Sequence, residues 1–181
     1  NNNISHNFKA KQELVSIYDK KTASYNTKDK NVLIEKRVMK PLNTMLDAFY
    51  EKTRQKTINI VAGHRDMEKQ QSLYDQSIAQ NGMEHTSKFV AIPGRSEHHT
   101  GLALDFSIFY ENSRASKEYS GRGEYAWINE NCYKYGFVQR YKSEKKDITM
   151  IEDEPWHFRY VGIPHAVIME ENNFCLEEYI D

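Results

Sequence analysis

The sequence has little cysteine, no excess of either charge and no long apolar stretch, and each of these shortages excludes a class of protein. Among 181 residues there are only two cysteines, Cys132 and Cys175, too few for a disulfide framework or a four-thiolate zinc site. Lys and Arg number 25 against 26 Asp and Glu, so the basic excess typical of nucleic-acid-binding proteins is missing. No apolar run approaches the roughly 18 residues that a membrane-spanning helix needs.

The remaining composition is typical of one folded domain. Hydrophobic residues make up 39% and charged residues 28% of the sequence, and its 181 residues suffice for a single core. The two cysteines could form one bridge, but we expect two buried thiols, because unpaired cysteine behaves as a small core residue. No signal peptide is visible, and the sequence starts with Asn1 rather than Met. We therefore expect that an upstream tag, signal or membrane anchor is missing from it.

Hydrophobic periodicity predicts a single α+β domain, with a central antiparallel sheet flanked by helices. Helices and strands mix without the regular alternation that builds parallel sheets. We expect residues 1–34 to form an N-terminal arm and residues 35–181 to form the domain that carries any activity. Helices are expected over 35–56 (kinked at, or beginning near, Pro41), 67–80, 124–135 and the C-terminal end; strands over 58–62, 102–109, 137–141 and 157–161; and loops over 83–97, 110–123 and 142–147.

The segment Ser96–Asp105, with the sequence SEHHTGLALD, carries the first group of chemically capable side chains. In a strand, Asp105 would share a face with Ala103 and Ser107, whose small side chains leave room for a ligand beside the carboxylate. His98 lies an odd number of residues earlier, so a turn must bring it back to the same face. Thr100 and Gly101 supply that turn.

The segment Glu154–His157, with the sequence EPWH, supplies a second imidazole and a second carboxylate. His157 would begin a strand, and Pro155 places Glu154 in a turn rather than in the regular strand. Taken singly, each of these residues has an ordinary structural interpretation. Together, two histidines and one aspartate make a three-ligand zinc set with a fourth position for water, and a glutamate that does not bind metal can act as general base on that water.

The two motifs together resemble a known family. Ser-x-His-x-x-Gly-x-Ala-x-Asp over residues 96–105, followed by Glu-x-x-His over 154–157, is similar to the zinc D-Ala-D-Ala peptidases of the VanY, VanX and VanXY type, a group that also contains L,D-carboxypeptidases. The resemblance covers roughly residues 58–165. It extends to the flanking segments Phe89-Val90-Ala91, Pro93-Gly94, Tyr135-Gly136-Phe137, Arg140-Tyr141 and Glu154–Gly162.

The resemblance implies a role for each matching residue. His98, Asp105 and His157 would bind one zinc ion, with Glu154 as general base. Arg65, at the strand-to-helix turn, would assist the polarised carbonyl or the substrate carboxylate. Substrate contacts are expected from Gln70, Ser96, Ser107 and Trp156, although the two serines and the tryptophan could equally serve the loop or the core. The other histidines with a structural or surface interpretation are His99, His64, His85 and His165.

The function that the resemblance implies is removal of the terminal D-Ala from peptidoglycan stem peptides or precursors that end in D-Ala-D-Ala. This reaction would destroy the terminus that vancomycin binds, or would trim the wall. Three alternatives stay open: an L,D-carboxypeptidase acting on tetrapeptides, a dipeptidase acting on free D-Ala-D-Ala, and a zinc-holding module that binds wall peptides without cutting them. The implied location is extracytoplasmic, through an anchor in a missing segment, with a cytoplasmic enzyme as the alternative.

Overall fold

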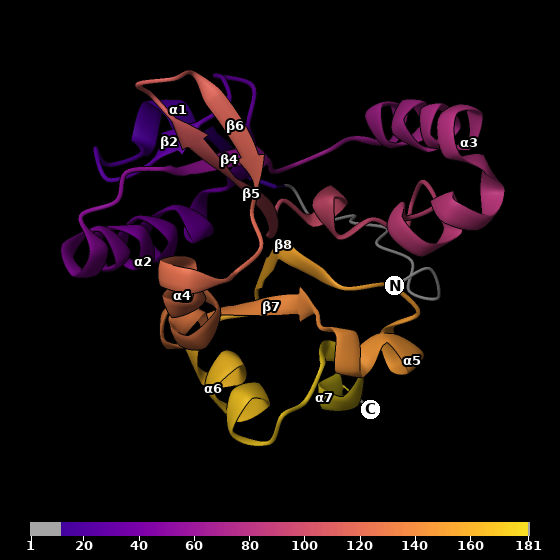
Figure 1. Ribbon diagram of the computed structural model, residues 1–181. Helices are drawn as coiled ribbons and strands as arrows, with labels where there is room; N and C mark the ends of the chain where they lie inside the picture. Colours follow the sequence, from indigo (N-terminus) through magenta and orange to yellow (C-terminus); the bar gives the residue numbers. More distant parts are fainter. Residues whose placement is uncertain (1–11, 181) are drawn as a thin grey trace.

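The computed structural model describes residues 12–180, which form one α+β domain (Figure 1). The order of its elements along the chain is β1 (Leu14–Ser16), α1 (Ile17–Lys20), β2 (Asn26–Thr27), β3 (Leu33–Glu35), α2 (Lys36–Thr53), β4 (Ile58–Ala62), α3 (Met67–Phe89), the 3-10 helix η1 (Glu97–Thr100), β5 (Ala103–Tyr110), β6 (Ala115–Glu118), η2 (Gly123–Tyr125), α4 (Ala126–Asn131), η3 (Cys132–Tyr135), β7 (Phe137–Tyr141), η4 (Ser143–Lys145), α5 (Lys146–Thr149), β8 (Glu154–Tyr160), α6 (Ile163–Glu171) and α7 (Leu176–Ile180).

The main sheet has the strand order β2-β4-β5-β8-β7, and β6 pairs with β5 outside that path. The sheet is antiparallel, as expected, except at one edge, where β2 runs parallel to β4. Along one side of β5 the partner strand changes from β8 to β6. Asp105 still pairs with His157 of β8, whereas Ser107, two residues later, pairs with Glu118 of β6. The strands β5 and β8 therefore part immediately after the Asp105–His157 pair.

Helix α2 covers the sheet with the apolar face that its periodicity predicts. Val38, Leu42, Met45 and Phe49 are all fully buried in the main core. Pro41 lies in the second turn of the helix without ending it. In Figure 1, α2 and α3 lie on either side of β4 and β5, while α6 and α7 lie beside β7.

The described part of the expected N-terminal arm is integral to the domain. Strand β1 pairs with β3 in a separate two-stranded sheet. Ile17, Tyr25 and Ile34 are buried in the same core as α2. Residues 1–11 of the expected arm lie outside the described residues.

Three segments expected to be loops contain regular structure. Helix α3 does not end at Gly82 but resumes after a non-helical residue there (φ 81°, ψ 166°) and runs to Phe89. The Ser77 and Thr86 hydroxyls lie 2.8 Å apart and tie the two halves together. Residues 115–118 form β6, and 143–149 form η4 and α5. The sequence missed β6 because all four of its residues are exposed, so it has no apolar pattern.

Cys132 and Cys175 are both buried and unpaired, which confirms the expectation of two free thiols. Burial raises the pKa of Cys132 to about 12. Within residues 12–180 the structure contains no helix with the length and hydropathy needed to cross a bilayer.

Candidate active site

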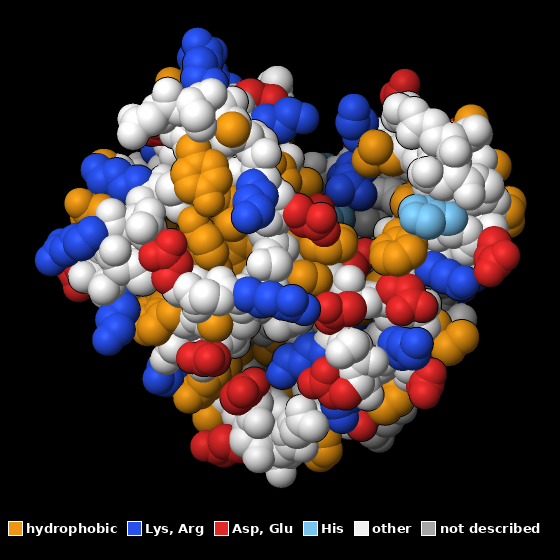
Figure 2. Space-filling view, viewed as in Figure 1, with side chains coloured by type: hydrophobic (Ala, Val, Ile, Leu, Met, Phe, Trp, Pro, Cys, Tyr) orange, Lys and Arg blue, Asp and Glu red, His pale blue; other side chains and the backbone are white. Residues whose placement is uncertain are grey.

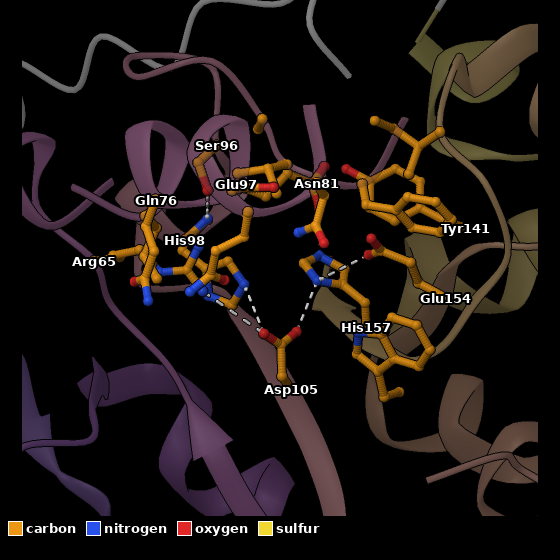
Figure 3. Close-up of a pocket in the computed structure, with 18 residues that line it drawn as sticks. Arg65, Gln76, Asn81, Ser96, Glu97, His98, Asp105, Tyr141, Glu154 and His157 are labelled. Atoms are coloured by element: carbon orange, nitrogen blue, oxygen red, sulfur yellow. Dashed lines mark hydrogen bonds and ion pairs between the residues drawn. The ribbon is translucent and has the colours of Figure 1, made fainter. Parts of the chain in front are cut away.

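A cavity of about 410 Å³ lies between α3 and the open end of the β5–β8 pair. Figure 2 shows the molecular surface hollowed between the part formed by α3 and the part formed by β5 and β6. Figure 3 shows that the side chains of His98, Asp105, Glu154 and His157 converge at this cavity. Both predicted motifs therefore contribute side chains to one site.

The three predicted ligands meet within bonding range of a single ion. One ligand atom each from His98, Asp105 and His157 lies within 4.8 Å of the others. Nε2 of His98 is 3.2 Å from Oδ2 of Asp105, and Nδ1 of His157 is 2.9 Å from its Oδ1. The predicted turn is present, since η1 ends at Gly101 in the left-handed conformation (φ 67°) that favours glycine.

Hydrogen bonds hold the ring orientation of both histidines. Nδ1 of His98 donates to the Gly63 carbonyl oxygen at 2.7 Å, which leaves the Nε2 lone pair for a metal ion. His157 presents the opposite nitrogen, because its Nε2 faces the Glu97 carboxylate at 3.4 Å and its Nδ1 faces Asp105. Burial lowers the pKa of His98, so its imidazole is in the neutral form that metals bind.

The two imidazoles differ in charge when no metal is bound. Burial alone would lower the pKa of His157, but its hydrogen bonds to Asp105 and Glu97 outweigh burial and raise that pKa to about 9. A metal ion bound at Nδ1 would displace a proton from this ring. Burial raises the pKa of Asp105, but His98 and His157 together hold it below its usual range.

Glu154 lies beside the three ligands without joining them. Its Oε2 is 3.8 Å from Nδ1 of His157, and burial raises its pKa to about 7, which suits a group that takes up and releases a proton near neutrality. The prediction that Pro155 keeps Glu154 in a turn is wrong. Glu154 is the first residue of β8 and pairs with Tyr141, beyond a register shift at which β8 has extra residues opposite β7.

Arg65 reaches the ligand cluster from the β4–α3 connection. Its Nη2 is 3.7 Å from Oδ2 of Asp105, and its Nη1 donates to Oε1 of Gln70 at 2.8 Å. Asp66, the next residue, accepts from the Lys69 N–H and caps α3, as predicted. The guanidinium therefore faces the cavity from a fixed backbone.

Two of the predicted substrate contacts lie elsewhere. Gln70 is fully buried, outside the cavity lining, and its Nε2 donates to the Ala91 carbonyl at 2.6 Å. Ser107 shares hydrogen bonds with Asn59 and lines a different surface pocket, because β5 carries it past the point where β8 departs. Ser96 and Trp156 both line the cavity; the Ser96 hydroxyl also accepts from the His98 N–H at 3.3 Å.

The other histidines among residues 12–180 do not join this ligand group. His99 uses both ring nitrogens on the backbone: Nδ1 donates to the Arg65 carbonyl at 2.6 Å, and Nε2 accepts from the Gly94 N–H at 3.0 Å. His85 stacks on Phe89. The ring of His165 is hydrogen-bonded to the Tyr179 hydroxyl.

Sequence reasoning missed several residues around the site. Glu97 is 3% exposed and contacts His157, and its position beside His98 in the first motif was the available signal. Burial raises the pKa of Glu97, but Arg140 and Arg159 outweigh it and hold the pKa well below its usual range. Polar side chains of α3 also line the cavity, and no sequence pattern predicted them: Gln76, Ser77, Gln80 and Asn81.

Comparison with known proteins agrees with this geometry. A profile of the VanY family, described as D-alanyl-D-alanine carboxypeptidase, matches residues 31–163. The chain belongs to the VanY family. A D-alanyl-D-alanine carboxypeptidase of Enterococcus faecium is 38% identical over 175 residues, which is 94% of this chain and 52% of the relative. The chain spans about half the length of the curated relatives it matches.

Solved structures of VanY-like proteins share the fold. The vancomycin resistance D,D-dipeptidase VanXYg, in complex with a D-Ala-D-Ala phosphinate analog, is 35% identical with a TM-score of 0.84, covering 99% of this chain and 68% of that one. A mutant of the vancomycin resistance D,D-pentapeptidase VanY, in complex with Zn(II), is 31% identical with a TM-score of 0.71, covering 93% and 98% of the two chains.

Proposed function

We propose that this VanY-family domain is a zinc-dependent D,D-carboxypeptidase that removes the terminal D-Ala from peptidoglycan peptides ending in D-Ala-D-Ala. The observation that carries the proposal is the cluster of His98, Asp105 and His157 with Glu154 beside it in one cavity. Support comes from relatives that are named D-alanyl-D-alanine carboxypeptidase and from the VanXYg complex with a D-Ala-D-Ala analog.

The donor set fits one zinc ion per chain. Two imidazole nitrogens and one carboxylate oxygen are typical of catalytic zinc sites, which keep a further position open. Each imidazole has its other nitrogen held by an acceptor, the Gly63 carbonyl for His98 and the Glu97 carboxylate for His157. Such outer partners are usual around metal-binding histidines. The related VanY structure in complex with Zn(II) supports the choice of metal.

In the proposed reaction, water cleaves the amide bond before the last D-Ala. Zinc, when bound, supplies a Lewis acid that polarises the scissile carbonyl and lowers the pKa of the attacking water. Glu154 takes a proton from that water and delivers it to the amine of the departing D-Ala. Arg65 stabilises the negative charge that develops on the carbonyl oxygen. Both side chains line the same cavity as the three ligands.

Peptide length and stereochemistry distinguish the proposal from its alternatives. The purified protein would be incubated with zinc and, separately, with free D-Ala-D-Ala, a stem pentapeptide and a stem tetrapeptide, and released D-Ala would be measured. We expect release from the pentapeptide to be fastest. Preference for the tetrapeptide would indicate an L,D-carboxypeptidase, and preference for the free dipeptide a dipeptidase. Binding without release from any of them would indicate a wall-peptide-binding module.

The proposed substrate is a cell-wall peptide, so we also propose an extracytoplasmic site of action. Removal of the terminal D-Ala would remove the terminus that vancomycin binds. A strain producing the full-length protein should therefore carry fewer pentapeptide stems in its wall. Mass spectrometry of digested wall material, together with fractionation of the producing cells, would test both points; an unchanged stem composition would contradict them.

A further inference from the structure

A buried chain of charged side chains connects His157 to the C-terminal helix α7. Oε2 of Glu97 lies 3.4 Å from Nε2 of His157, and its Oε1 accepts a 2.8 Å hydrogen bond from Nε of Arg140. Arg140 also donates from Nη1 and Nη2 to the two carboxylate oxygens of Glu177, at 2.9 and 2.6 Å. This network of charged side chains therefore joins η1, β7, β8 and α7.

Burial of these charged side chains has a large desolvation cost, so the network is a poor source of folding stability. The side chains of Glu97 and Arg140 are each 1% exposed, and that of Glu177 is 10% exposed. Arg159 completes the charge balance, with Nη1 3.2 Å from Oε1 of Glu97. Desolvating such groups costs several kcal/mol each, and apolar residues of similar size often stabilise a fold as well or better. Folding stability alone therefore does not explain this network.

What the network holds is the orientation of one imidazole ring. His98 presents Nε2 to Asp105, since its Nδ1 is fixed by the Gly63 carbonyl. His157 presents Nδ1 to the same carboxylate at 2.9 Å, which requires its Nε2 to point away from the ligand cluster. The ionised Glu97 carboxylate can only accept a hydrogen bond, so it favours the tautomer of His157 that carries its proton on Nε2.

We infer that Glu97 is a positioning residue that orients His157 for metal binding, and that Arg140 and Glu177 hold Glu97 in place. The inference rests on the proposed function, because it assumes that His157 binds zinc. Arg140 and Glu177 do not line the cavity. Helix α7 thus contributes to the site through Glu177, although Glu177 itself does not line the cavity.

The test measures metal binding rather than hydrolysis. Glu97→Gln keeps the shape of the side chain and removes its charge. We expect its zinc affinity, from competition with a chelator, to fall roughly 10- to 100-fold, as for other partners of metal-binding histidines. The visible spectrum of the cobalt(II)-substituted protein should change as well. Glu178→Gln is the control, since Glu178 lies next to Glu177 on α7 but pairs with Lys145 at 2.8 Å; it should keep wild-type affinity and spectrum.

A second variant keeps the inference testable if Glu97→Gln does not fold. Glu177→Gln leaves Glu97 in place but weakens its support, so it should lower zinc affinity in the same direction by a smaller factor. Thermal unfolding of each metal-free variant would be recorded alongside. A lowered Tm with wild-type zinc affinity and an unchanged cobalt spectrum would mean that the network is only structural, and would overturn the inference. A wild-type protein that binds no zinc would instead overturn the proposed function, and the inference with it.

Discussion

Asp105 and His157 are direct partners in the β5–β8 ladder, and their side chains meet at 2.9 Å on one face of the sheet. Residues opposite each other on antiparallel strands point to the same face, so the sheet register alone brings these two groups together. His98 joins them from η1, the short turn that leads into β5. Two of the three proposed zinc ligands thus lie on adjacent strands of the main sheet.

Loss of either histidine should abolish stoichiometric zinc binding. His98→Ala and His157→Ala each leave two ligands, which is fewer than catalytic zinc sites use. Elemental analysis of the purified variants after dialysis would measure the metal directly. His85→Ala is a suitable control, because His85 only stacks on Phe89 and should not affect zinc content. One zinc per chain retained in both ligand variants would exclude the assignment.

Arg65 and Gln70 should behave as a coupled pair. Arg65→Lys should lose about 2–4 kcal/mol of transition-state stabilisation, because a point charge does not replace the planar guanidinium. Gln70→Ala removes the acceptor that holds Nη1 of Arg65 and should lower kcat without any direct contact to substrate. A double-mutant cycle should give a coupling of about 1 kcal/mol or more, within the range for residues in contact. Strict additivity would show that Gln70 does not position Arg65.

Ser96 and Ser107 were both predicted to contact substrate, but their replacement should affect activity to different extents. Ser96 lines the cavity and caps the turn that carries His98, so Ser96→Ala should lower kcat/KM. Ser107 bonds Asn59 and lines another pocket, so Ser107→Ala should leave kcat/KM close to wild type. Steady-state kinetics on one pentapeptide substrate would compare the two. A larger loss from Ser107→Ala than from Ser96→Ala would contradict this placement.

The cysteines should be unreactive in the native protein. Burial raises the pKa of Cys132 to about 12, so at pH 8 only about one thiol in ten thousand is ionised there. Burial also raises the pKa of Cys175, which is 6% exposed. Titration with a chromogenic disulfide reagent at pH 8 should show slow reaction in buffer and two rapid thiols in denaturant. Fast reaction of the folded protein would mean that at least one thiol is accessible.

The sequence predicted the ligand set better than its surroundings, for a physical reason. His98, Asp105 and His157 lie in two short motifs whose residue types are unusual together, and strand alternation indicated which face Asp105 would occupy. Gln70 and Ser107 were expected to contact substrate but lie outside the cavity lining, because sequence spacing reveals neither the tertiary partner of Gln70 nor the point where β5 and β8 part. Glu97 depends on Arg140 and Glu177, which lie 43 and 80 residues further along the chain and meet it only through the tertiary fold.

The fold shows the same division between local and long-range information. The strand over 137–141 and the apolar face of α2 follow from local pattern, and both lie where they were expected. The parallel pairing of β2 with β4 and the fully exposed strand β6 depend on partners distant in the sequence. Helix α3 passed its expected end because the Ser77–Thr86 contact supports a second helical segment beyond Gly82.

The central claim is that Glu154 acts on water while three other residues bind zinc, and one paired measurement tests it most directly. Zinc stoichiometry and D-Ala release would be measured on the same preparation of Glu154→Ala, with Glu152→Ala as the control, since Glu152 lies outside the cavity lining. We expect wild-type zinc content, and hydrolysis lowered by about 100- to 10,000-fold in Glu154→Ala alone. Loss of zinc together with activity would show that Glu154 is a ligand. Undiminished hydrolysis with zinc bound would show that another group activates the water, and would contradict the mechanism.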